Sequence, residues 1–143
     1  RDRNGAGIRA EGRNLTVRRC LFKSDENGIL TANAKGSTIL VEHSEFADSG
    51  HGDGRSHGIY IGKIHRFVFR FNYVHGTKVG HHVKTRAAEN IVAYNLLYDG
   101  AGNSSYAVDL NNPLYSLVVG NVIQQGRAAE NSSQVQLGAK VNF

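Results

Sequence analysis

A six-residue motif recurs along the chain and limits the folds that it can adopt. Each copy reads apolar, two variable residues, small polar or amide, one variable residue, apolar. The fourth position falls at Cys20, Ser44, Asn72, Asn95 and Asn121, so successive copies are 24, 28, 23 and 26 residues apart. A unit this short cannot bury an apolar face alone, so neighbouring units must stack into one continuous core.

A second motif interleaves with the first and identifies the secondary structure. Its copies are centred on Ile8, Ile29, Ile59, Val83, Val108 and Val135. Short β-branched segments separated by Gly, Asn, Ser and Asp are typical of strands and turns. The stretch 87–97 could form a helix by propensity, but its Val92, Asn95 and Leu97 keep the spacing of the repeat. We therefore expect strands there too.

These repeats predict an all-β chain, because strands that recur in one direction lie parallel and parallel connections are nearly always right-handed. The expected fold is a right-handed parallel β-helix, a solenoid of about six coils, with residues 1–143 forming a single β-helix domain or a fragment of one. Asn72, Asn95 and Asn121 are expected to be buried, with their amides bonded between coils. The ends lack polar caps, so we expect a longer protein, whose missing coils or another chain cover them.

The amino-acid composition limits the classes of binding partner that we expect. The net charge of +5 and the pI near 9.6 suggest an anionic partner, although they also fit simple solubility. An anionic polysaccharide is favoured over nucleic acid, because the basic residues are not interleaved with exposed aromatic residues. The single Cys20 leaves neither an internal disulfide nor a cysteine metal site. No apolar run reaches the roughly 20 residues of a membrane span.

The residues of candidate chemistry gather on one outer face of the predicted coils. If Val83 points into the core, strand alternation places His82, Lys84 and Arg86 outside. Stacking the coils makes Tyr60, Lys84 and Asp109 neighbours along the solenoid axis, with Asn111 beside them. The Gly-rich loop 47–56 could bring three further side chains over this face, and His57 stands where the strand begins. The three loop residues are His51, Asp53 and Arg55.

This set of residues suits proton abstraction at C5 of a uronate, where a cation must first neutralise the sugar carboxylate and a base must then take the proton. The predicted catalytic residues are Lys84, Arg86, His82, His57 and Tyr60, and the predicted substrate-binding residues are Asp109, Asn111, Arg55 and His51. No residues are assigned to a metal, and the one cofactor considered is a divalent cation such as calcium. The alternatives are a surface ion pair between Lys84 and Asp109 and turn roles for the histidines.

The pattern resembles the right-handed β-helix proteins that include pectate lyases, alginate lyases and mannuronan C5-epimerases. The stretch Gly52–Ile61, then Gly76-Thr77-Lys78 and His82–Arg86, is similar to the epimerase region. That family has Asp-Pro-His-Asp before its strand, where this chain would use His51 or His57. The chain also resembles bacterial β-helix repeat proteins that have a similar His-x-x-Lys-x-Arg strand.

The resemblance implies a secreted or periplasmic, carbohydrate-active protein of lyase or epimerase type that acts on an acidic polysaccharide. The alternative from another class is a non-catalytic structural or glycan-binding β-helix module. A hydrolase ranks third, because hydrolysis needs paired carboxylates and this face offers only Asp109.

Overall fold

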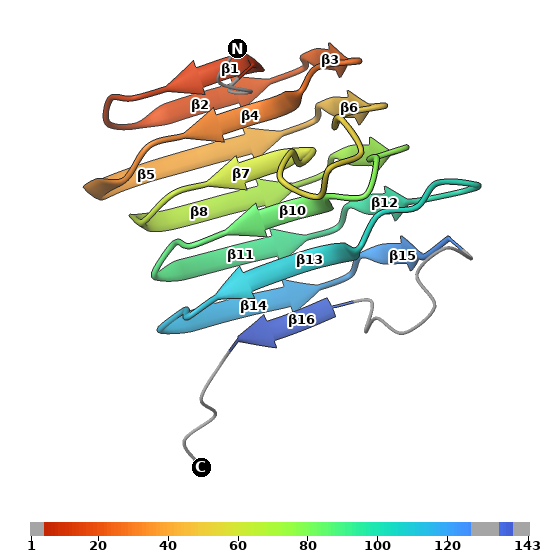
Figure 1. The fold of residues 1–143 in the computed structure, drawn as a ribbon. Coiled ribbons are helices and arrows are strands. Elements are labelled where there is room, and N and C mark those ends of the chain that lie inside the picture. Colours follow the sequence, from red (N-terminus) through yellow and green to blue (C-terminus); the bar gives the residue numbers. More distant parts are fainter. Residues whose placement is uncertain (1–4, 127–134, 139–143) are drawn as a thin grey trace.

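The structure, a computed structural model, describes residues 5–126 and the backbone of residues 135–138. This part of the chain is all-β, and its strands form three parallel sheets, one on each side of a right-handed β-helix. Figure 1 shows the coils stacked one below the other from the N-terminal strand to the C-terminal one. The solenoid has about five turns, slightly fewer than the six expected. No helix that could cross a membrane occurs in the described residues.

Each coil contributes one strand to each sheet. Sheet A has the order β1 (Ala6–Ala10), β4 (Asn27–Thr31), β7 (Ile59–Ile61), β10 (His81–Thr85), β13 (Tyr106–Asn111), β16 (Val135–Gly138). Sheet B has the order β14 (Tyr115–Val119), β11 (Glu89–Ala93), β8 (Ile64–Arg70), β5 (Ala34–Glu42), β2 (Leu15–Arg18). Sheet C has the order β15 (Val122–Gln124), β12 (Leu96–Tyr98), β9 (Tyr73–His75), β6 (Glu45–Ala47), β3 (Leu21–Lys23).

The core is a set of apolar columns that run along the axis. Ile29, Ile59, Val83 and Val108 are paired in register in sheet A, and none of them is exposed. This column confirms the stacking predicted from the second motif. The stretch 87–97 forms β11 and β12 rather than a helix, because its apolar residues continue the columns of the neighbouring coils.

The turn between sheets B and C carries the predicted amide ladder. The Oδ1 of Asn95 accepts hydrogen bonds from the backbone N–H and the Nδ2 of Asn72, at 2.9 and 3.1 Å. The Oδ1 of Asn121 does the same for Asn95, with both distances 2.9 Å. Asn72 and Asn95 are buried as expected, whereas Asn121 is half-buried. The ladder therefore joins the coils at a turn where backbone groups would otherwise lack partners.

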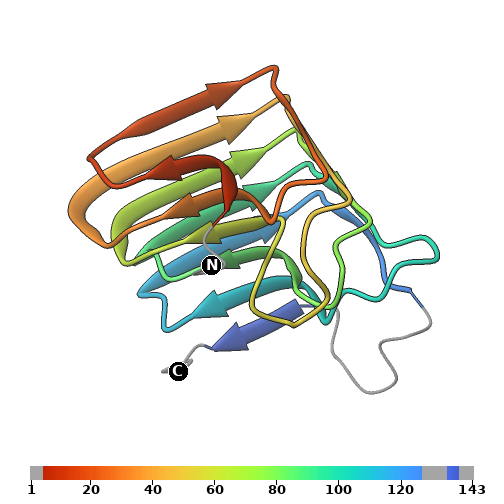
Figure 2. The same cartoon turned by 45° about the horizontal axis from the view of Figure 1, so that its top comes forward.

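The loop between β6 and β7 leaves the solenoid at the corner between sheets C and A (yellow in Figures 1 and 2). It is tied to the body of the molecule by backbone bonds from Gly50 to Asp25 and from Lys78 to Ser49, at 3.1 and 2.8 Å. The chain returns from this loop directly into His57 and β7, so the loop lies beside the start of the sheet A strands.

Candidate functional site

A second ladder runs along the entrance to sheet A and builds the candidate site. The Oδ1 of Asn27 accepts the backbone N–H of His57 at 2.9 Å. One coil further on, the Nδ1 of His57 accepts the backbone N–H of His81 at 3.1 Å. Each side chain thus holds the backbone of the next coil, which fixes where His57 and His81 stand.

At the end of this ladder lies a buried carboxylate with two basic partners. The Oδ2 of Asp109 lies 2.8 Å from Lys84 Nζ and 3.1 Å from His81 Nε2. The Asp109 side chain is only 4% exposed. Burial alone would raise the pKa of Asp109, but hydrogen bonds from His81 and Lys84 and their charges outweigh it and lower that pKa. Asp109 is therefore a carboxylate that holds both side chains in place.

The Asp109 contact selects the tautomer of His81. Because the carboxylate accepts a hydrogen bond, we assign the ring proton to Nε2, which leaves a lone pair on Nδ1 in the neutral ring. That Nδ1 is buried and has no hydrogen-bond partner in the described part of the chain. In Asn27 and His57 the equivalent atom holds the next backbone N–H. His81 is thus the point at which the ladder leaves a basic nitrogen unused.

His57 supports this arrangement without being a free base itself. Burial lowers the pKa of His57 to about 3, and the electrostatic interactions of His57 with His81 and Lys84 act in the same direction. The ring is therefore neutral near pH 7, and its Nδ1 lone pair is occupied by the His81 N–H. One face of His57 stacks on Tyr60, with ring centroids 5.8 Å apart.

The prediction that His82 lies on the outer face is wrong. His82 is fully buried, its Nδ1 is 2.8 Å from Thr77 Oγ1, and its Nε2 is 3.6 Å from Asp99 Oδ1. Burial lowers the pKa of His82 to about 4. Alternation fails because the consecutive residues His82 and Val83 both point inward. His81 therefore lies beside Lys84 on the outer side of the sheet, where neighbouring side chains leave it only 11% exposed.

The sequence contained a signal for this inward turn. The positions equivalent to His82 in the other coils of sheet A are Gly7, Gly28, Gly58 and Ala107, as the strand registers show. A Cβ on Gly28 would lie 2.6 Å from the Phe46 ring. Small residues at a recurring position indicate an enclosed space, and so this column could have identified His82 as internal and His81 as external.

Other predicted residues lie where the register placed them. Tyr60, Lys84 and Asp109 are cross-strand neighbours in sheet A. The Nδ2 of Asn111 donates to Asp109 Oδ1 at 2.9 Å. Arg86 is half-buried just beyond β10, and its guanidinium makes no ion pair with any described residue. Tyr106, which the sequence reasoning missed, meets the His81 ring edge-on at 5.1 Å.

Within the described part of the chain, no contact joins the His51 or Arg55 side chain of the Gly-rich loop to Lys84, His81 or Asp109. The exposed His51 has its Nε2 3.4 Å from Glu26 Oε2, so it faces the preceding coil rather than Lys84. Arg55 is exposed, and its backbone N–H bonds to Asp53 Oδ1 at 3.0 Å. The negative charge of Asp53 does reach His57, where it tends to raise the histidine pKa. Among the described residues, no group of three or more His, Cys, Asp or Glu side chains is arranged to hold a metal ion.

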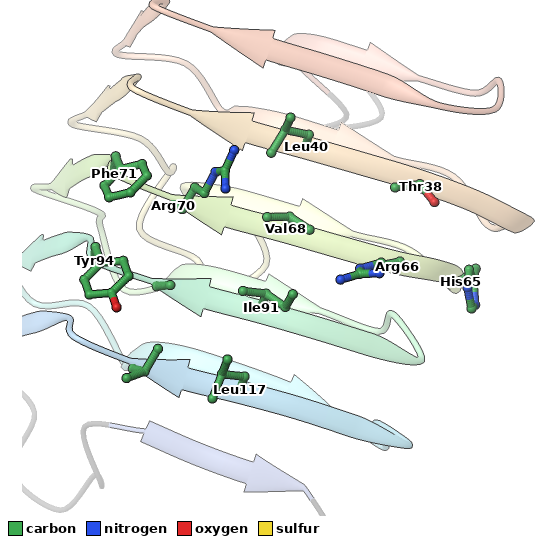
Figure 3. Close-up of a pocket in the computed structure, with 12 residues that line it drawn as sticks. Thr38, Leu40, His65, Arg66, Val68, Arg70, Phe71, Ile91, Tyr94 and Leu117 are labelled. Atoms are coloured by element: carbon green, nitrogen blue, oxygen red, sulfur yellow. The ribbon is translucent and has the colours of Figure 1, made fainter.

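A separate groove lies on the outer face of sheet B (Figure 3). It has a volume of about 630 Å³ and is bordered by β5, β8, β11 and β14. None of its lining residues belongs to the set predicted from the sequence.

Comparisons with known proteins add no relative to this description: no protein-family model, no curated protein and no solved structure matches the chain. The fold class therefore rests on the structure itself, and the chemistry has to be argued from the side chains.

Proposed function

We propose that this β-helix acts on a uronate-containing polysaccharide by abstracting the C5 proton, in a lyase or epimerase reaction. The observation that carries the proposal is the buried Asp109 carboxylate, which binds Lys84 and His81 together and leaves the His81 Nδ1 without a partner. A carboxylate that orients a histidine in this way is a common device for presenting a base.

The roles follow from the position and charge of each group. Arg86 lies two residues after Lys84, directly beyond the end of β10, and it has no ion-pair partner in the described chain. Its planar guanidinium suits the sugar carboxylate. Lys84 supplies a second positive charge next to the reacting carbon, which stabilises the negative charge that develops. His81 replaces His82 and His57 as the base of this proposal.

The proton and electron balance of the reaction is simple. His81 Nδ1 takes the C5 proton, and the C5–H electron pair moves into the neighbouring carboxylate. In a lyase, that pair then forms the C4=C5 double bond while the C4–O bond breaks, and Tyr60 gives its proton to the leaving oxygen. In an epimerase, a proton returns to C5 from the opposite side. Exchange with water restores both side chains, so no other reactant is needed.

One observation favours the second candidate, a non-catalytic glycan-binding module. The Nδ1 of His81 is enclosed, so a substrate has to displace its cover before the atom can act as a base. In that case Lys84 and Arg86 attract an anionic glycan without reacting with it. The catalytic proposal therefore requires the Tyr106 ring, which meets the His81 ring edge-on, to move when substrate binds.

The test uses the 143-residue chain with alginate, pectate and glycosaminoglycans, with and without calcium. We expect either ultraviolet absorbance from an unsaturated uronate or incorporation of deuterium at C5 in deuterated water. Binding of one of these polymers without product or exchange would replace the enzyme by the binding module. If the chain neither binds nor reacts with any of these polymers, both candidates are contradicted.

A further inference from the structure

The groove on sheet B combines an apolar floor with a positively charged rim. The floor is an axial row of side chains, one from each of four neighbouring strands, namely Leu40, Val68, Ile91 and Leu117. Figure 3 shows this row with Phe71 and Tyr94 on one side and Thr38, His65 and Arg66 on the other. Its volume of about 630 Å³ is within the usual range for small-ligand sites, roughly 300–1,000 Å³.

The rim has one sign of charge. Arg66 and Arg70 line the groove, and no carboxylate of the described chain does so. The nearest acid to Arg66 is Glu89, whose Oε2 lies 4.0 Å from Arg66 Nε, the outer limit of an ion pair. Arg66 is therefore only weakly neutralised, and the groove favours a ligand with a negative group.

Arg70 is fixed in a position from which it can bind such a negative group. Its Nε donates to Glu42 Oε2 at 2.7 Å, and its guanidinium lies 5.7 Å from the Phe71 ring centre. Hydrogen bonds from Arg70 and Arg18 lower the pKa of Glu42, so this anchor stays ionised near neutral pH. The terminal Nη groups of Arg70 have no acceptor within the described residues, which leaves a fixed donor edge facing the groove.

The aromatic wall is built at a backbone cost. Phe71 and Tyr94 have φ angles of 57° and 56°, in the left-handed region that non-glycine residues avoid at about 1–2 kcal/mol each. Their rings stack with centroids 5.6 Å apart, and both side chains are exposed. Gly120 occupies the same turn in the next coil, where a Cβ would lie 2.4 Å from the Tyr94 ring. Arg19 and His43 hold the same turn position in the two preceding coils and also have positive φ angles, so this conformation belongs to the repeating turn. What distinguishes Phe71 and Tyr94 is that their exposed rings stack at the edge of the groove.

From these observations we infer that the sheet B groove binds a small amphipathic anion, with its acid group on Arg70 and its apolar body along Val68, Ile91 and Leu117. The aliphatic floor fits an alkyl or similar apolar body, because it offers almost no hydrogen-bonding groups to a sugar chain. This site is separate from the Lys84 face and does not depend on the proposed reaction.

The probes are octanoate below its micelle concentration, acetate as the acid group alone, and octanol as the apolar body alone. Binding is followed by amide chemical shifts in the full 143-residue chain. Octanoate should shift residues of β5, β8, β11 and β14 and bind at least tenfold more tightly than either fragment. Equal affinity for octanol, or shifts spread over all three sheets, would overturn the proposal.

Two matched pairs of variants locate the contacts. Arg18 and Arg70 both bind Glu42, at 2.5 and 2.7 Å, but only Arg70 lines the groove. Arg70→Gln should weaken octanoate about tenfold or more, the usual effect of losing a charged hydrogen bond, whereas Arg18→Gln should not. Leu117 and Leu96 are similarly exposed, at 41% and 38%, and only Leu117→Ser should weaken binding.

The same measurements distinguish the proposed anion from two other possible occupants of the groove, a second copy of the chain and the polysaccharide. Sedimentation that shows a dimer, with octanoate unable to bind until the dimer dissociates, would assign the face to a second copy of the chain. Shifts in sheet B caused by oligouronates but not by octanoate would assign it to the polysaccharide. Either result, or an unchanged octanoate affinity in Arg70→Gln, contradicts the inference.

Discussion

The Oδ1 of Asn95 accepts two hydrogen bonds from Asn72, one from its backbone N–H at 2.9 Å and one from its side-chain Nδ2 at 3.1 Å. The Nδ2 of Asn95 in turn donates to the backbone oxygen of Phe69 at 3.0 Å. One buried amide thus satisfies three groups in the preceding coil. Adjacent coils are therefore joined at this turn by side chains as well as by strand pairing.

Removing this amide should destabilise the fold. Asn95→Ala is expected to lower the free energy of unfolding by about 1–3 kcal/mol, because buried polar groups lose their partners. Asn33→Ala is the control, since the exposed Asn33 accepts only the Lys63 N–H, at 2.7 Å. Urea unfolding of both variants measures the difference. An Asn95→Ala variant as stable as the control would show that the ladder adds nothing to stability.

The small-residue column of sheet A gives a second stability test. A Cβ on Gly58 would lie 2.6 Å from the His82 carbonyl oxygen, whereas one on Gly12 would meet nothing within 4 Å. Gly58→Ala should therefore cost about 1–3 kcal/mol of unfolding free energy through crowding. Gly12→Ala should stay within about 0.5 kcal/mol of the wild type. Equal midpoints in thermal unfolding of the two variants would contradict the enclosed position of this column.

Acidification should destabilise the protein through its buried histidines. The folded pKa of His57 is about 3 and that of His82 about 4, both below the ordinary value of 6.5. At a pH between the folded pKa and 6.5, these histidines bind a proton in the unfolded chain but not in the folded one. Their contribution to the free energy of unfolding is therefore complete above about pH 6.5 and is lost as the pH falls toward the folded pKa values. Asp109 acts in the same direction only at lower pH, because its folded pKa lies below 3.8.

The variant His57→Asn isolates one part of this effect, because the asparagine oxygen can replace Nδ1 as the acceptor for the His81 N–H. Between pH 6.5 and pH 4, its unfolding free energy should fall less steeply than that of the wild type, by about 1 kcal/mol per pH unit. Parallel curves from urea unfolding at several pH values would mean that His57 is not held neutral in the folded state.

Two substitutions on the Lys84 face follow from the proposed reaction. Lys84→Ala should lower turnover by about 10²-fold or more, because the charge that stabilises the reacting carboxylate is lost. Arg86→Lys should raise KM more than it lowers kcat, because a two-pronged contact becomes a point charge. Steady-state kinetics on the active polymer measures both. Wild-type kinetics in both variants would place the reaction elsewhere on the protein.

The register of the repeat was readable from the sequence because the same chemistry recurs in every coil. Val83 between Ile59 and Val108, and Asn95 between Asn72 and Asn121, were placed correctly on this basis. Strict alternation, in contrast, predicted the wrong histidine. The turn into β10 points His82 and Val83 inward together, and this local geometry is visible only through the Gly and Ala residues of the other coils.

The remainder of the site depends on three-dimensional contacts that no spacing specifies. The unused Nδ1 of His81 follows from a contact with Asp109, 28 residues further along the chain. The sheet B groove was not anticipated, because Arg70 becomes a site only when Glu42 fixes it from the preceding coil. Such pairs are set by the stacking of particular coils, which the motif describes only on average.

The most direct test of the proposed function is deuterium incorporation at C5 of an oligouronate, measured by NMR in deuterated water with the wild type, His81→Asn and His82→Asn. We predict that wild type either incorporates deuterium at C5 or forms the C4=C5 unsaturated product, and that His81→Asn lowers the rate observed by about 10²-fold or more. In His82→Asn the folded fraction should keep its exchange rate, because His82 is buried away from Lys84. Exchange that is unaffected in His81→Asn, or lost only in His82→Asn, would contradict the assignment of His81 as the base.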